Sequence, residues 1–127
     1  MQEKNLYEYA VIRIMPRVER EEFLNVGVVL YCAGKKFLQV KYMLGTERVT
    51  SFCHTCDVEE IETYLKAFAQ IAEGENDAGP ISKLPPAARF RWLTATRSTV
   101  VQTSKVHPGM CIDPTLMLQK LFNDLVG

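Results

Sequence analysis

The residues best suited to chemistry lie between Leu84 and Pro114, a stretch with three arginines, several hydroxyl groups, the single tryptophan and one of two histidines. No Asp or Glu occurs from residue 78 to residue 112. Guanidinium groups bind phosphates and carboxylates through paired hydrogen bonds, and neighbouring hydroxyl groups add further donors. The pattern therefore predicts a site for a small anionic ligand, with these candidate residues: Arg91, Arg97, Ser98, Thr99 and His107.

The same arginines have a plainer interpretation as partners of acidic side chains. Four carboxylates open the helix expected from residue 57, namely Asp57, Glu59, Glu60 and Glu62. Exposed ion pairs of this kind form readily and contribute less than about 1 kcal/mol each. The two interpretations place the arginine side chains differently, so the structure bears directly on the choice.

The overall charge argues against nucleic-acid binding. Lys and Arg together number 15, as do Asp and Glu, so the net charge is zero. A nucleic-acid-binding domain usually carries a basic excess, and none of its common motifs occurs here. Nucleic-acid binding stays as a second alternative function, which would show an affinity that falls steeply with salt.

Cys53 and Cys56 form a CxxC pair. With His107 and Cys111 they could supply four zinc ligands, and their place just before a helix is also that of a redox dithiol. No secretory signal opens the chain and no apolar run would span a membrane, which predicts a cytoplasmic protein. In that compartment we interpret all four cysteines as reduced thiols, and we expect neither a metal nor a cofactor.

Hydroxyl, imidazole and carboxylate groups also occur in an order compatible with nucleophilic catalysis: Ser98 or Ser104, His107 and Asp113. Cys111 with His107 would be the thiol counterpart. No nucleophile-elbow motif surrounds either serine, and Asp113 before Pro114 is better explained as a helix N-cap. The sequence contains no recognisable catalytic motif, and whether the protein is an enzyme stays open.

Glu22 and Asn25 precede a strand-like run and form a further candidate binding pair. Paired carboxylates such as Glu21 and Glu22 could hold a metal ion or move protons. The neighbouring Arg17 and Arg20 favour a solvated helical surface instead.

Alternating and β-branched residues predict strands over residues 7–16, 25–32, 36–44 and 97–106, with a hairpin joining the second and third. Gly27 within the second strand indicates a bulge or a close approach by another group. Apolar residues at spacings of three and four predict long helices from Asp57 to about Gly74 and from Asp113-Pro114 onward. A short helix is expected after Pro85.

These elements predict a single domain over residues 1–127 with an α+β fold. We expect a two-layer sandwich, in which a mostly antiparallel sheet of about four strands carries its two main helices on one face. The other face would be uncovered and would carry Tyr9, Val11, Val29 and Tyr31. An uncovered apolar face favours a homodimer or another protein partner.

Two stretches, YAVIRIMPRVEREEFLNVGVVLYC and RFRWLTATRSTVVQTSKVHPGMCIDP, resemble the bacterial domain of unknown function 3037 family. The resemblance covers nearly the whole chain and leaves out Cys53 and Cys56. Members of the family are sometimes encoded beside HipA-like kinases, which implies an accessory role and a kinase-like partner. The family pattern contains these residues: Glu22, Asn25, Gly27, Arg91, Trp92, Arg97, Ser98, Thr99, His107 and Asp113.

Two classes of function therefore compete. The favoured prediction is a small non-enzymatic interaction module that binds a protein partner. The alternative is an enzyme or sensor for an anionic small molecule or nucleotide, which requires Arg91, Arg97, Ser98 and His107 to converge in one pocket.

Overall fold

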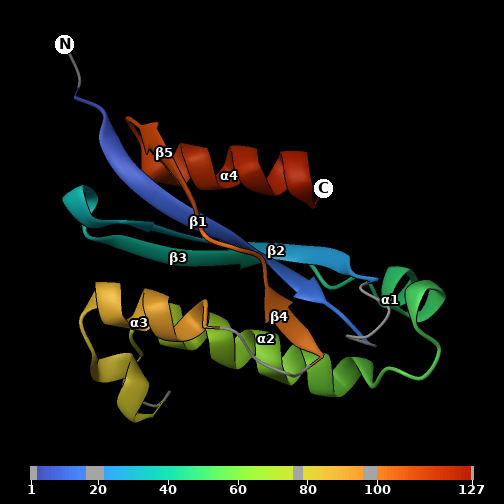
Figure 1. The fold of residues 1–127 in the computed structure, drawn as a ribbon. Coiled ribbons are helices and arrows are strands. Elements are labelled where there is room, and N and C mark those ends of the chain that lie inside the picture. The colour runs from blue at the N-terminus through green and yellow to red at the C-terminus, as the bar shows by residue number, and fades with distance from the viewer. Residues whose placement is uncertain (1–2, 17–21, 76–78, 96–99, 127) are drawn as a thin grey trace.

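The computed structural model describes residues 3–16, 22–75, 79–95 and 100–126. Its five strands form one antiparallel sheet in the order β3-β2-β1-β4, with β5 also paired to β1 (Figure 1). The strands are β1 (Asn5–Ile14), β2 (Leu24–Cys32), β3 (Phe37–Tyr42), β4 (Val101–Thr103) and β5 (His107–Cys111). The predicted α+β class and the antiparallel sheet are confirmed.

β4 and β5 share one edge of β1. β4 pairs with Ile12–Ile14 and β5 with Asn5–Tyr9. Of the strand expected over residues 97–106, the described part contains only β4, and β5 follows it as a strand that was not expected. The sequence did not predict β5, because it contains Pro108 and Gly109, and both residue types are uncommon inside strands. Gly109 is required here, since a Cβ at this position would collide with the Tyr7 ring.

The described helices are α1 (Thr46–Phe52), α2 (Val58–Glu73), α3 (Pro86–Leu93) and α4 (Pro114–Leu125). The carboxylate of Asp57 accepts the Glu60 N–H at the start of α2, and Gly74 ends that helix with a left-handed φ of 74°. The carboxylate of Asp113 accepts the N–H groups of Thr115 and Leu116 in α4. None of the helices in the described part of the chain is both long and apolar enough to cross a membrane.

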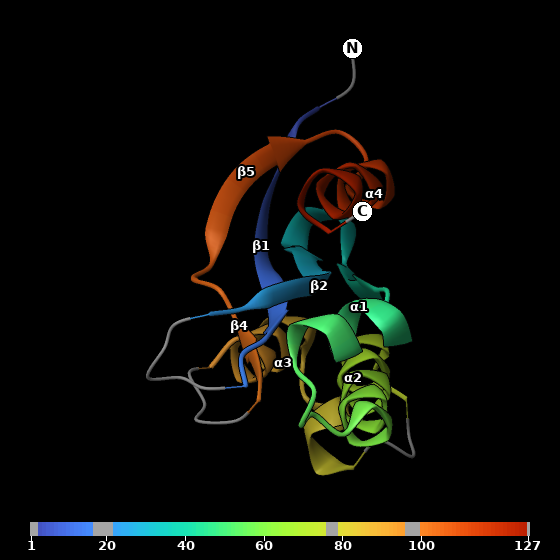
Figure 2. The same ribbon diagram turned by 90° about the vertical axis from the view of Figure 1, so that its right-hand side faces the viewer.

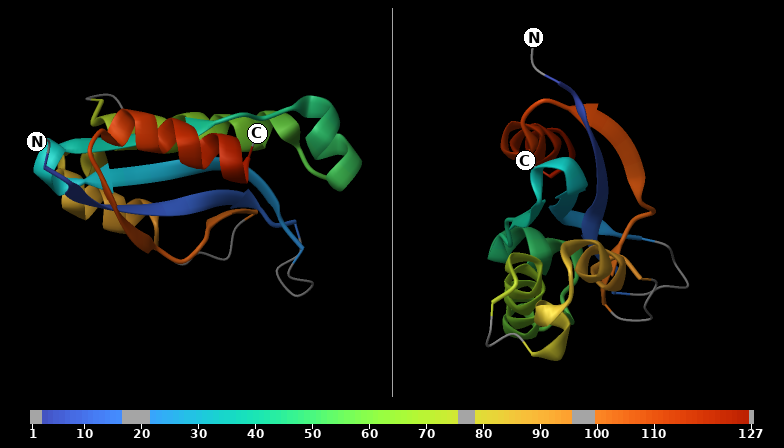
Figure 3. Two further views of the ribbon diagram at one scale, coloured as in Figure 1. Left: turned by 90° about the horizontal axis from the view of Figure 1, so that it is seen from above. Right: turned by 90° about the vertical axis from the view of Figure 1, so that its left-hand side faces the viewer.

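Helices cover both faces of the sheet (Figures 1 and 2). α2 and α3 pack on one face, where Ile12 and Val29 meet Leu65 in the larger core cluster. α4 packs on the other face, where Val28 and Leu30 meet Leu118 and Phe122. The view from above in Figure 3 shows α4 lying along the strands on its own side. We call these two sides the α2 face and the α4 face.

The expectation that both main helices share one face is therefore wrong, and so is that of an uncovered face. Val11 and Val29 are buried, the Tyr31 ring stacks on Phe90 of α3, and Tyr9 packs against the α4 cluster. The physical reason is that β2 is apolar at consecutive positions. A strand with apolar side chains on both sides is buried on both faces.

The predicted irregularity at Gly27 is confirmed. The β1–β2 register shifts between Ile12 and Arg13, because Ile12 pairs with Gly27 and Arg13 with Asn25. Val26 is the extra residue of a bulge in β2. A Cβ at residue 27 would lie 2.8 Å from the Lys41 carbonyl oxygen and 2.8 Å from the Tyr42 Cβ. The strand β3 thus passes too close to this position for any side chain.

We expect Gly27→Ala to lower the free energy of unfolding by about 2 kcal/mol, because the added methyl group must push β3 backbone aside. Gly45→Ala is the matched control, since its Cβ would lie 3.6 Å from the Arg48 Cβ, at ordinary contact distance. Urea unfolding followed by circular dichroism measures both. Equal effects of the two substitutions would contradict the close approach.

Candidate functional site

The residues predicted to form one anion pocket do not come together where the structure describes them. Arg91 is exposed on α3, which packs on the α2 face. His107 is exposed on β5, and its ring lies 5.3 Å from that of Tyr9, which packs against the α4 cluster. Arg91 and His107 therefore lie on opposite faces of the sheet. Arg97, Ser98 and Thr99 fall outside the described residues.

Asn25 has a structural role that explains its residue type. Its side-chain amide donates a hydrogen bond of 3.2 Å to the Leu125 carbonyl in the last turn of α4. Its oxygen accepts a bond of 3.3 Å from Arg13 Nε. The half-buried Asn25 thus ties the sheet to the carboxyl end of α4. Glu22, the other predicted member of this pair, is exposed just ahead of β2.

Arg13 completes this contact. Its guanidinium group lies 4.0 Å from the centre of the Phe23 ring, in a cation–π contact. Burial lowers the pKa of Arg13 below its ordinary value, and the group stays charged at neutral pH. A cation near the carboxyl end of a helix is stabilised by the helix dipole. The sequence placed Arg13 in mid-strand but gave no indication of these partners.

The cysteines fall into two separate pairs. Cys53 and Cys56 are joined by a disulfide with Cα atoms 5.5 Å apart, so the interpretation of all four cysteines as reduced thiols is wrong for this pair. Cys32 and Cys111 are buried free thiols on the α4 face. Among the described residues, no group of three or more His, Cys, Asp or Glu is placed to hold a metal ion. The four-ligand zinc set considered above is not assembled.

The hydroxyl and carboxylate considered for catalysis are engaged by the backbone. The Ser104 hydroxyl, which is buried, accepts the Val11 N–H at 2.9 Å and donates to the Lys105 carbonyl at 2.9 Å. The Asp113 carboxylate accepts the N–H groups at the start of α4. Both side chains therefore stabilise local structure, and Ser98 lies outside the described part of the chain.

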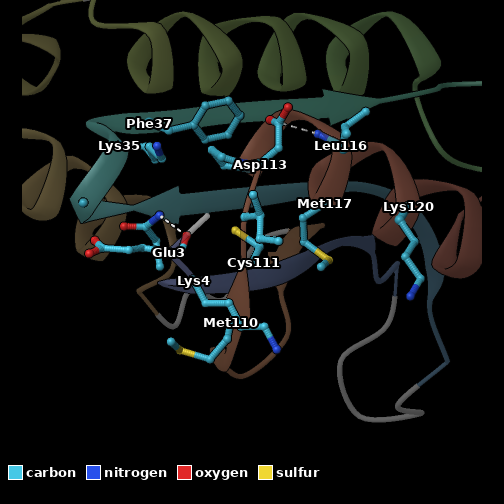
Figure 4. A pocket seen from close by; sticks show the side chains of 14 residues that line it. Glu3, Lys4, Lys35, Phe37, Met110, Cys111, Asp113, Leu116, Met117 and Lys120 are labelled. Carbon is cyan, nitrogen blue, oxygen red and sulfur yellow. Dashed lines mark hydrogen bonds between the residues drawn. The ribbon is translucent and has the colours of Figure 1, made fainter. Parts of the chain in front are cut away.

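A pocket of about 1250 Å³ lies at the amino-terminal end of α4 (Figure 4). Three stretches distant in sequence build it: the start of β1, the turn between β2 and β3, and the continuous stretch from the end of β5 into the first turns of α4. We call it the α4 pocket. Its apolar lining comprises Phe37, Met110, Ile112, Pro114, Leu116 and Met117. Sequence reasoning missed it, although Leu116 gave a signal as an apolar residue outside the buried stripe of α4.

Lysines surround the apolar lining of the α4 pocket. Lys4, Lys35 and Lys120 belong to three different segments and point toward its rim in Figure 4. Glu3 and Asp113 are the acidic residues that line it, and Asp113 is already engaged as a helix cap. The charged residues that line the pocket are thus three lysines and two carboxylates, one of which is held by the α4 backbone.

The pocket also contains the Cys111 thiol. Burial raises its pKa, and the neighbouring Cys32 and Asp113 raise it further, against a smaller opposite effect of Lys35. The thiol is therefore protonated at neutral pH, whereas nucleophilic cysteines need the thiolate. The pocket offers an apolar surface with a cationic rim and no activated nucleophile among the residues that line it.

The fold and this site define a small α+β domain with an apolar, lysine-rimmed pocket. The family model described as "Protein of unknown function (DUF3037)" matches residues 9–126, and the chain belongs to this family. The resemblance seen in the sequence is thereby confirmed. No curated protein and no solved structure shows a significant match to the chain.

We expect Asn25→Ala to lower the free energy of unfolding by about 1 to 3 kcal/mol, because it leaves the Leu125 carbonyl and Arg13 Nε without their partner. Asn123→Ala is the matched control, since Asn123 is exposed on α4 and bonds only to Gln119 across one helical turn. Thermal and urea unfolding measure both variants. If Asn25→Ala leaves the stability unchanged, the structural role of Asn25 is contradicted, and Asn25 is again a candidate for ligand binding.

Proposed function

We propose that this protein is a small non-enzymatic interaction module that binds a protein partner at the α4 pocket. The observation that carries the proposal is the exposure of large apolar side chains around that pocket. Met110, Ile112 and Leu116 expose 53%, 44% and 69% of their surface. Leu6, which lies directly opposite Met110 in the β1–β5 pairing, is 56% exposed as well. Contiguous apolar surface of this kind marks sites of association.

The dimensions of the pocket favour a polypeptide over a metabolite. Sites for small molecules are commonly about 300 to 1000 Å³ and enclose most of their ligand. The α4 pocket has about 1250 Å³, and its lining includes the exposed side chains of Met110, Ile112 and Leu116. A helix or extended segment of a partner would cover both Leu116 and Met110. A small ligand would cover only one of them.

The lysine rim indicates the chemistry of the partner. Lys4, Lys35 and Lys120 form no ion pair with another described residue, and they border the apolar lining. A segment with apolar residues on one side and carboxylates on the other would satisfy both features. We therefore propose an acidic amphipathic segment as the bound element. The rim charges would accelerate association and make it depend on salt.

The groups in the pocket support binding over catalysis. The Cys111 thiol is held protonated by burial, and the Asp113 carboxylate is engaged by the α4 backbone. The partner class that the family resemblance implies is a HipA-like kinase encoded nearby. A kinase-like protein presents acidic surface segments as readily as other globular proteins do, so this partner is the first to test.

We expect Leu116→Glu to weaken binding to the purified kinase-like neighbour at least tenfold, because it places a charge in the apolar lining and repels an acidic segment. The fold should be retained, since a carboxylate in the first turn of a helix is favourable. Titration calorimetry with the full chain measures the affinity, and thermal unfolding checks the fold.

Met43→Glu is the matched control, because Met43 is 57% exposed beyond the far end of β3 and receives the same change. It should bind like the unaltered chain. Equal weakening by both substitutions would contradict the proposed site. Absence of binding to every purified product of the adjacent genes, or concentration-dependent self-association through Leu116, would overturn the proposal of a separate protein partner.

A further inference from the structure

The Cys53–Cys56 disulfide lies at the junction of two helices. Cys53 is the C-cap of α1, and its N–H donates to the Val49 carbonyl at 2.8 Å. Cys56 directly precedes Asp57, the N-cap of α2. The bond closes a loop of only four residues. Such a short loop restricts the unfolded chain least, so the bond is poorly suited to be a structural staple.

The two cysteine residues differ in how deeply they are buried. The side chain of Cys53 is buried, whereas that of Cys56 is half-buried. Cys56 also lines a second pocket, of about 490 Å³, together with Thr55, Ile61 and Tyr64. An incoming thiol can therefore approach Cys56 from this pocket, while the surrounding chain shields Cys53.

A hydroxyl group lies beside the buried sulfur. Thr55 Oγ lies 3.5 Å from Cys53 Sγ, within hydrogen-bonding distance for sulfur. If the disulfide opens by attack at Cys56, Cys53 leaves as a thiolate, and the Thr55 hydroxyl is placed to donate to it. Access to the attacked sulfur and a well-stabilised leaving thiolate both favour thiol–disulfide exchange.

We propose that Cys53 and Cys56 form a reversible redox pair that exchanges with an external thiol, with Cys56 as the sulfur attacked. A thiolate RS⁻ forms an RS–Sγ bond to Cys56 as the Cys53–Cys56 bond breaks, and the electron pair passes to Cys53, which takes a proton from water. A second thiol then attacks the R sulfur, forms RS–SR and releases Cys56 as a thiol. Two thiols lose two electrons, and one disulfide gains them.

This site is separate from the α4 pocket. The pocket lies at the turn between β2 and β3, and the disulfide follows α1, which begins beyond the other end of β3 (Figure 1). The redox proposal is therefore independent of the proposal that a partner binds at the α4 pocket. The external thiol is either a small molecule such as glutathione or a dithiol protein, and the chemistry at Cys56 is the same for both.

The test equilibrates the full chain in buffers with graded ratios of reduced to oxidised glutathione, followed by thiol alkylation and mass spectrometry. Cys53 and Cys56 should become alkylated together, with the dependence of a two-electron couple. Cys32, which is fully buried and lines neither pocket, serves as the internal control and should stay unmodified in the folded chain. A parallel series with a purified dithiol protein in place of glutathione identifies which source reduces the pair faster.

Two variants locate the attacked sulfur. Cys53→Ser leaves Cys56 as a single accessible thiol and should trap a glutathione adduct on it, whereas Cys56→Ser should form at least tenfold less adduct on Cys53. Circular dichroism confirms that both variants fold. The proposal is overturned if the pair stays oxidised or stays reduced at every ratio, if one equivalent of zinc holds it as a dithiolate, or if both variants form adducts equally.

Discussion

Burial of the central strands on both faces is the constraint on which the rest of the structure depends. In β2, Val28 and Leu30 point to the α4 face while Val29 points to the α2 face, and all three are fully buried. Each such side chain contributes about 1.5 to 3 kcal/mol when it leaves water. Neither face can stay open without losing much of this energy, so α4 must cover the face that α2 and α3 leave.

The position of α4 then decides where the interaction surface can lie. Its buried residues Leu118 and Phe122 are fixed on the sheet, and Asn25 holds its carboxyl end through the Leu125 carbonyl. The first turn consequently projects near β5, and Leu116 and Met110 both stay exposed and line the α4 pocket. A helix required for the core thereby also presents the apolar wall of the α4 pocket.

Structural features that depend on nearby residues could be predicted from the sequence, whereas features that depend on contacts between distant segments could not. The caps at Asp57 and Asp113 and the bulge at Gly27 depend on residues close in the chain or on backbone space, and all three are confirmed. The side of the sheet that α4 covers depends on the apolar residues of both faces of β2. The α4 pocket combines three stretches that are distant in sequence, and the arginine-rich stretch is divided because α3 carries Arg91 to the α2 face.

Hydrogen exchange of the full chain, with and without a purified HipA-like kinase as the proposed partner, tests the proposed interaction surface most directly. Backbone amides in the open state exchange with solvent, and a bound partner slows exchange where it covers or stabilises the backbone. The account predicts added protection in β5, in the turn between β2 and β3 and in the first turns of α4, with no change around Met43. Protection confined to α1 and the start of α2, or spread evenly over the chain, would contradict it.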